Sequence, residues 1–212
     1  MKTTILFLAI ALSMGTAMAD DSRYTESMTK NIEIVYKAGT NEELLQAVNA
    51  FDRIGGAEKT KWEPFYYAAF GYVMMANRES EPAKKDSYLD QAKVAIDKAA
   101  AVRQNDSEIV ALEGFINMIR VTVDPASRGQ KYSGMAMQSF DQAIALNPEN
   151  PRALALMAQM QFGTARFFKA STAEACATTT KAIEKFSTYK SENALAPSWG
   201  KGMAEGLLKQ CQ

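Results

Sequence analysis

The sequence predicts an all-α fold built from helix pairs that follow one another along the chain. Residues with high helix propensity, chiefly Ala, Leu, Met, Gln, Glu and Lys, dominate its 212 positions. A fixed spacing of small and larger apolar residues recurs along the chain, and proline or glycine breaks separate the segments that carry it. This length suffices for one domain with a substantial core.

The N-terminal segment MKTTILFLAIALSMGTAMA, residues 1–19, has the features of a secretory signal peptide. An apolar run over 5–12 is followed by the small residues Ala17 and Ala19, which mark a cleavage point. No later stretch approaches the ~20 apolar residues of a membrane span. We therefore expect an exported domain over 20–212, periplasmic or extracellular, that is soluble after cleavage and does not insert into a membrane.

The recurring spacing places a small, a larger and a second small residue at i, i+4 and i+7, which is one face of a helix. It is clearest at Ala136, Phe140 and Ala143. The same positions recur at Ala47, Phe51 and Ile54, at Ala92, Ile96 and Ala99, and at Ala175, Thr179 and Ala182. Gly71 and Gly114 interrupt apolar stripes upstream. Since glycine in a helix costs ~1 kcal/mol relative to alanine, both predict close helix contacts.

Two prolines three residues apart define one helix boundary. Proline has no backbone N–H, so Pro148 and Pro151 cannot both lie inside one helix. We expect one helix to end near Leu146 and Asn150 to cap the next, with Pro151 at its first position.

Capping motifs mark further helix starts. Thr40 with Glu43, and Ser171 with Glu174, have capping-box spacing, and Ser198 is placed to cap a last helix. The resulting helix pairs are expected at about 22–57, 62–103, 107–147 and 151–187, with a capping helix at about 198–211.

These residues resemble the tetratricopeptide repeat, whose signature has Gly on a first helix and Ala, an aromatic residue, Ala and Pro on a second. The likeness is greatest over 107–151, at Gly114, Ala136, Phe140, Ala143 and Pro148. It extends more weakly over 62–187, with 22–57 as a divergent first unit. The resemblance implies a right-handed α-solenoid of helix–turn–helix pairs that binds protein or peptide partners.

In the register of that family, the first helices line an inner groove. The residues expected at this groove are Phe65, Tyr72, Met75, Phe115, Met118, Arg152, Gln159 and Phe162. The same stripe also suits a core. Successive anchor alanines lie 45, 44 and 39 residues apart, against about 34 in the family. We expect the surplus as longer first helices and as loops over 77–86 and 123–131, which form a second candidate binding rim.

Composition excludes several function classes. The sequence has no histidine, which removes the usual general base and the commonest transition-metal ligand. Without residues 1–19, whose only charge is Lys2, 23 basic residues face 24 acidic ones. This balance offers no general attraction for nucleic acid. Phosphate-binding, nucleophile-elbow and metal-spaced motifs are absent. We therefore expect no enzyme activity, no cofactor and no metal site.

Two function classes remain open. The first is an exported, non-catalytic interaction or scaffold module, monomeric or weakly self-associating, that binds protein segments through the groove or the loop rim. The second is a periplasmic protein that binds a small molecule or glycan on an aromatic platform. The residues of that platform would be Trp62, Tyr66, Tyr67 and Tyr72.

The two cysteines, Cys176 and Cys211, allow one intramolecular pairing. If the helix that carries Cys176 ends near Ser187 and the capping helix returns antiparallel, both cysteines reach nearly the same level. We expect a disulfide that clamps the capping helix. The alternative is a small buried Cys176 and a free thiol at Cys211.

Overall fold

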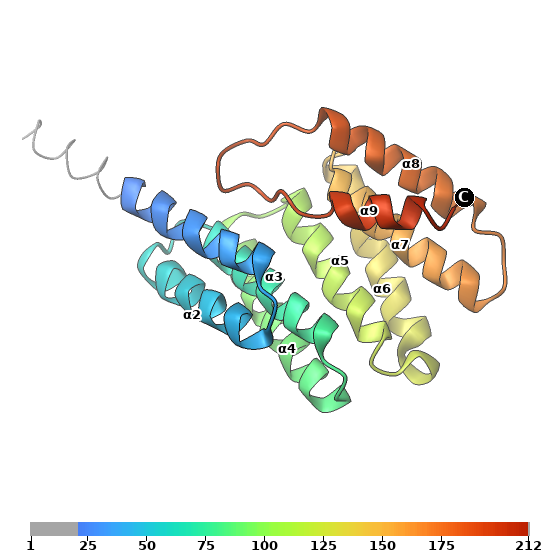
Figure 1. The fold of residues 1–212 in the computed structure, drawn as a ribbon, viewed down its shortest axis with the longest axis horizontal. Coiled ribbons are helices and arrows are strands. Elements are labelled where there is room, and N and C mark those ends of the chain that lie inside the picture. The colour runs from blue at the N-terminus through green and yellow to red at the C-terminus, as the bar shows by residue number, and fades with distance from the viewer. Residues whose placement is uncertain (1–20, 212) are drawn as a thin grey trace, which may run out of the picture.

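The computed structural model describes residues 21–211, and within that range the chain is all-α, without a strand (Figure 1). The expected signal peptide, 1–19, lies outside the described residues. The helices are one over 21–37, then α2 (Asn41–Ala57), α3 (Glu63–Arg78), α4 (Pro82–Val102), α5 (Ser107–Val121), α6 (Pro125–Leu146), α7 (Pro151–Phe167), α8 (Ala173–Thr188) and α9 (Lys201–Leu208).

Consecutive helices pack against one another, most extensively α5 with α6 and α3 with α4, followed by α2 with α3 and α7 with α8. The helices α3, α5 and α7 also contact one another in turn. The residues of the recurring pattern form the seams of this packing. Those that are buried are Ala47, Phe51, Ala92, Ile96, Ala99, Ala136, Phe140, Ala143, Ala175, Thr179 and Ala182. Periodicity therefore identified the core face of each second helix.

Gly71 and Gly114 lie where another helix approaches closely, as expected. A Cβ on Gly71 would lie 2.5 Å from Val48 Cγ2 of α2, and one on Gly114 would overlap the Phe140 ring of α6. No larger residue fits at either position without moving its neighbour.

Several expected helix ends are confirmed. α6 ends at Leu146, and the Asn150 side chain accepts from the N–H groups of Arg152 and Ala153 to cap α7, with Pro151 at its first position. Thr40 and Glu43 form the capping box of α2.

Two expected caps are wrong. α8 begins after Thr172, one residue later than expected. Ser171 Oγ accepts from the N–H of Ala173, whereas a capping box requires the N–H of Glu174. α9 begins after Gly200, which has a positive φ of 101°. Ser198 instead donates its backbone N–H to Tyr36 Oη.

In the two middle units the surplus residues lengthen the second helices, contrary to the expectation of longer first helices and loops. α4 and α6 have 21 and 22 residues, whereas α3 and α5 have 16 and 15. Pro82 and Pro125 each occupy a first helical position, where the missing N–H costs nothing. Most of the expected loop residues are therefore helical, and the connections are 79–81 and 122–124.

The C-terminal part folds back onto the rest of the chain. After α8 a linker runs out over the middle of the molecule and returns to α9, which packs on α7 and α8 (Figure 1). The expected disulfide between Cys176 and Cys211 is present, with Cα atoms 5.7 Å apart. It joins α8 to the end of α9 beside Leu207.

Candidate functional site

The face of the first helices, where the resemblance placed a binding groove, is covered by the chain itself. The indole of Trp199 stacks on Phe70 of α3 and Phe115 of α5, with ring centroids 4.8 Å and 5.8 Å away. Trp199 Nε1 donates to Tyr66 Oη at 3.0 Å. The linker segment 189–200 therefore acts as a strap across α3 and α5, and this face is not free.

Tyr67 fastens the strap at a second point, where its hydroxyl donates to the Leu195 carbonyl oxygen at 2.8 Å. Burial raises the pKa of both Tyr66 and Tyr67 well above the ordinary value. Both phenols therefore stay protonated through the neutral range, and the hydrogen bonds of the strap persist there.

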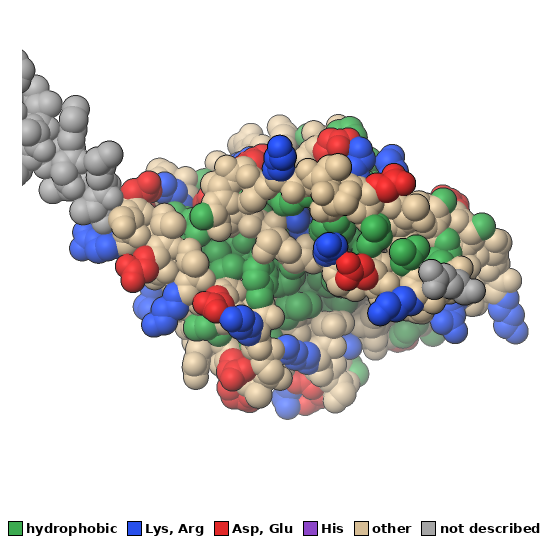
Figure 2. All heavy atoms as spheres, turned by 45° about the horizontal axis from the view of Figure 1, so that its top comes forward, with side chains coloured by type: hydrophobic (Ala, Val, Ile, Leu, Met, Phe, Trp, Pro, Cys, Tyr) green, Lys and Arg blue, Asp and Glu red, His purple; other side chains and the backbone are tan. Residues whose placement is uncertain are grey.

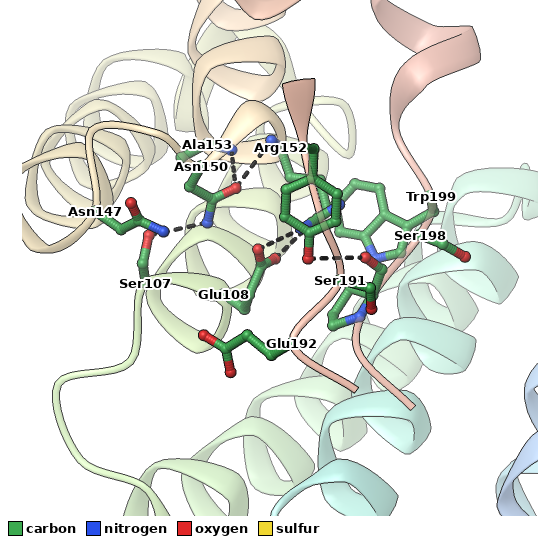
Figure 3. Close-up of polar contacts among 12 residues, drawn as sticks. Ser107, Glu108, Asn147, Asn150, Arg152, Ala153, Ser191, Glu192, Ser198 and Trp199 are labelled. Atoms are coloured by element: carbon green, nitrogen blue, oxygen red, sulfur yellow. Dashed lines mark hydrogen bonds and ion pairs between the residues drawn. The ribbon is translucent and has the colours of Figure 1, made fainter. Parts of the chain in front are cut away.

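Arg152, fully buried at the start of α7, joins the strap to the helices (Figure 3). Its Nε and Nη2 atoms donate to the Glu108 carboxylate at 2.7 Å and 2.6 Å, and its guanidinium lies 4.4 Å from the Tyr189 ring centroid. Burial disfavours the charged guanidinium, but the hydrogen bonds and charge of Glu108 outweigh it and raise the pKa of Arg152. This arrangement is a structural support for the strap.

A polar hollow of about 570 Å³ lies under the strap, between the ends of α4, α6 and α8. Charges of both signs line it, and they are largely paired with one another. Arg103 bridges to Asp106 at 2.7 Å and to Glu192 at 3.3 Å. Lys185 bridges to Glu149 at 2.5 Å. Because most of these charges are paired with one another, they do not favour a ligand of one sign.

A larger hollow of about 780 Å³ lies at the other end of the helices, between the end of α5, the beginning of α6 and the end of α7. We call it the apolar groove. Its apolar lining consists of Met118, Ile119, Val121, Pro125, Ala126, Met160, Phe167 and Phe168, and its polar lining of Asn77, Thr122, Gln130, Ser133, Gln159 and Thr164. Gly129, Gly134 and Gly163 complete it. None of these residues is charged, so the groove suits an apolar body.

The three glycines of the apolar groove differ from those at the helix seams. A Cβ added at Gly129, Gly134 or Gly163 would meet no atom within 4 Å. All three lie within helices, where glycine carries a cost. No helix packing in the structure explains them, and their effect is to widen the groove.

Two adjacent phenylalanines form one wall of the apolar groove. Phe167 is 68% exposed and Phe168 is 71% exposed, and their rings meet edge to face with centroids 5.1 Å apart. Burying such rings is worth about 1.5–3 kcal/mol each. An exposed aromatic pair beside a hollow is typical of a binding surface.

The residues expected at the inner groove are dispersed. Tyr72, Met75, Phe115, Arg152 and Phe162 are buried in the packing, and Phe65 is half-buried, with its ring against Gly55. Met118 and Gln159 line the apolar groove. The aromatic platform residues Trp62, Tyr66, Tyr67 and Tyr72 are all buried. The site considered below therefore takes two residues from the expected set.

Sequence reasoning missed Phe167 and Phe168, although a signal was present. Neighbouring residues on a helix point about 100° apart, so two large aromatic residues in succession at a helix end broaden its apolar face beyond one narrow stripe. Gly163, four residues before Phe167, was a further signal. Gly114 is matched by the large residue Phe140 on the helix that follows it, whereas Gly163 has no such large residue against it.

The described residues contain no group of side chains suited to a metal ion. Over 21–211 no group of three or more His, Cys, Asp or Glu side chains could hold a metal ion. Among those residues, too, no helix is both long and apolar enough to span a membrane. On the face shown in Figure 2, hydrophobic side chains gather along the middle and charges of both signs are scattered around them.

Comparison with known proteins shows a likeness to a solved structure. No protein-family model and no curated protein matches the sequence. Among solved structures, the chain is similar to the HusA haemophore from Porphyromonas gingivalis, with a TM-score of 0.79 and 27% sequence identity. The match covers 89% of this chain and 92% of the haemophore. The likeness thus extends over nearly the whole of both molecules.

Proposed function

We propose that this protein is an exported carrier that binds haem, or a related planar tetrapyrrole, in the apolar groove. The observation that carries the proposal is the groove itself: an uncharged hollow with an exposed pair of phenylalanines, in a chain similar over 89% of its length to a haemophore. This is the second of the two function classes considered from the sequence, a small-molecule binder. Its site lies between α5, α6 and α7, and not at the aromatic platform of Trp62 and Tyr66.

The groove matches a planar macrocycle in size and chemistry. Its volume of about 780 Å³ lies in the range of small-molecule sites. Phe167 and Phe168 offer ring faces and edges to a flat π-system, and the thioethers of Met118 and Met160 are adaptable apolar contacts. The glycines leave room for a broad, flat body.

Apolar contact, more than coordination of iron, would hold the ligand. The sequence has no histidine, and both cysteines are in the disulfide. Of the usual haem ligands, the groove lining offers only the thioethers of Met118 and Met160. We therefore expect the metal-free macrocycle to bind with an affinity within about tenfold of that for haem, because the two molecules present the same apolar ring to the groove.

Protein-segment binding is the weaker reading. The helix pairs have the order expected of a repeat array, and we propose that they stack as divergent repeat units. A partner entering along the first helices would have to displace Trp199 and Leu195, which are already packed there. A carrier also needs no catalytic group, in keeping with the absence of histidine.

Export agrees with the proposed role. The N-terminal 19 residues have the pattern of a signal peptide. The disulfide between Cys176 and Cys211 is of the kind that persists in oxidising compartments. A carrier of this type would act in the periplasm or outside the cell.

The test places a larger side chain in the groove at positions where it should not disturb the fold. Leucine at Gly134 or Gly163 meets no protein atom at its Cβ, so Gly134→Leu and Gly163→Leu should fold. Leucine at Gly206 of α9, also in open space but outside the groove, is the matched control. Haem affinity is measured by absorbance titration, and the fold by circular dichroism.

We expect both groove variants to weaken haem binding at least about tenfold, which corresponds to a clash or lost contact of about 1.4 kcal/mol. Gly206→Leu should bind as the wild type does. Wild-type affinity in all three variants would exclude the groove as the site, and no binding to the wild type would exclude the function.

A further inference from the structure

We propose that the ligand of the apolar groove carries a carboxylate and that Lys85 receives it at the edge formed by Asn77 and Thr122. This inference rests on the proposed function and adds to it the charge and orientation of the ligand. The observation behind it is that Lys85 lies at the edge of an uncharged groove, where its ammonium group donates to a neutral hydroxyl.

Lys85 reaches the groove from the beginning of α4. Its Nζ donates to Thr122 Oγ1 at 3.3 Å. Thr122, directly after α5, lines the groove, and its hydroxyl donates to the Ile119 carbonyl oxygen at 2.7 Å. The threonine is therefore fixed in place, and it holds the ammonium group at the groove's edge.

Lys84 and Asp86 form ion pairs, whereas Lys85 interacts with the Glu79 carboxylate through its charge alone, without an ion pair. Lys84 bridges to Glu81 at 2.8 Å, and Asp86 accepts from Arg128 at 2.7 Å. Within 21–211 no carboxylate oxygen lies within 4.0 Å of Lys85 Nζ. A carboxylate that entered here would gain a charge-assisted hydrogen bond.

The two sides of the groove differ in chemistry, and this difference sets the direction of the ligand. Asn77 lies on α3 and Thr122 directly follows α5, whereas Phe167 ends α7 and Phe168 follows it. In the packing, α5 lies between α3 and α7. The apolar body of the ligand would therefore lie toward the phenylalanines. Its acidic edge would face Lys85, since a carboxylate left inside the uncharged lining would be desolvated without a partner.

The experiment compares an acidic macrocycle with its neutral ester. The probes are metal-free protoporphyrin, which carries two carboxylates, and its dimethyl ester, titrated under the same solvent conditions by fluorescence. The variant is Lys85→Met, which keeps the length and apolar stem of the side chain. Lys84→Met is the matched control, because its ammonium is paired with Glu81, whereas Lys85 donates to the groove residue Thr122.

We expect Lys85→Met to weaken binding of the diacid by about three- to tenfold, as for one partly exposed charge pair. Binding of the ester should not change, and Lys84→Met should alter neither affinity. Undiminished preference for the diacid in Lys85→Met would overturn the proposal, as would a selective loss in Lys169→Met, which removes a cation beside Phe168.

Failure of this inference differs from failure of the proposed function. If both probes still bind and Gly163→Leu still weakens both, the groove remains the site and only the role of Lys85 is refuted. If Gly163→Leu leaves both affinities unchanged, the groove is not the site, and the inference falls with it.

Discussion

The indole of Trp199 lies stacked on the ring of Phe70, although 128 residues separate them, with centroids 4.8 Å apart and planes 23° from parallel. This contact closes the face of the first helices. It divides the molecule into a covered face, held by the strap, and an open groove at the opposite helix ends. Stability and ligand binding therefore depend on different residues.

Truncation of Trp199 tests the structural role of the strap. Trp199→Ala removes two ring contacts and a hydrogen bond to Tyr66, so it should lower the free energy of unfolding by about 3 kcal/mol or more. Trp199→Phe keeps an aromatic ring but leaves Tyr66 Oη without its donor, so it should cost about 1–2 kcal/mol. Urea unfolding measures both. A cost below about 1 kcal/mol for Trp199→Ala would show that the strap is loosely held.

Alkaline pH should weaken the strap through Tyr67. Because burial raises the pKa of Tyr67 above its unfolded value of about 10, its contribution is fully present below that pH and is lost as the pH rises further. Tyr67→Phe removes this titration along with the hydrogen bond to Leu195. The wild type should therefore be the more stable protein at pH 8, and the two free energies of unfolding should converge above pH ~10. Parallel curves up to the alkaline limit would contradict this account.

Removal of the disulfide should loosen the end of the chain. Cys176 and Cys211 close a segment with a sequence separation of 35, so the double Cys→Ser variant should lose about 2–4 kcal/mol of stability. Backbone amides of α9 should exchange faster than those of α5. Haem affinity should stay within about twofold of the wild type, since α9 lies outside the groove lining. A large loss of affinity would show that the groove depends on the C-terminal clamp.

The sequence predicted the helix seams well because they are local and periodic. Gly114 and Phe140 were expected to bring helices together, and they meet directly. The Asn150 cap was readable because its signal spans only a few residues. α8 and α9 begin after Thr172 and Gly200, where tertiary packing outweighed the capping signals of Ser171 and Ser198.

The candidate site was largely unpredictable from periodicity. A stripe that contains Phe115 shows that a helix face is apolar, but not whether another helix, a ligand or the chain's own C-terminal segment covers it. Trp199 covers Phe115 from a linker without periodic pattern. Conversely, Gly163 and Phe168 are exposed, whereas Phe162 near the same helix end is buried beside Ala175 and Leu207.

The most direct test of the central claim is the response of methionine methyl signals to the metal-free macrocycle. The ring current of a bound porphyrin shifts nuclei that lie against its face. Met118 and Met160 line the groove, whereas Met28 is buried in the N-terminal part of the core and Met203 lies on α9. In methyl-labelled protein, the account predicts large, saturable shifts of Met118 and Met160 and little change at Met28 and Met203. Saturable shifts confined to other methionines, with Met118 and Met160 unmoved, would contradict it.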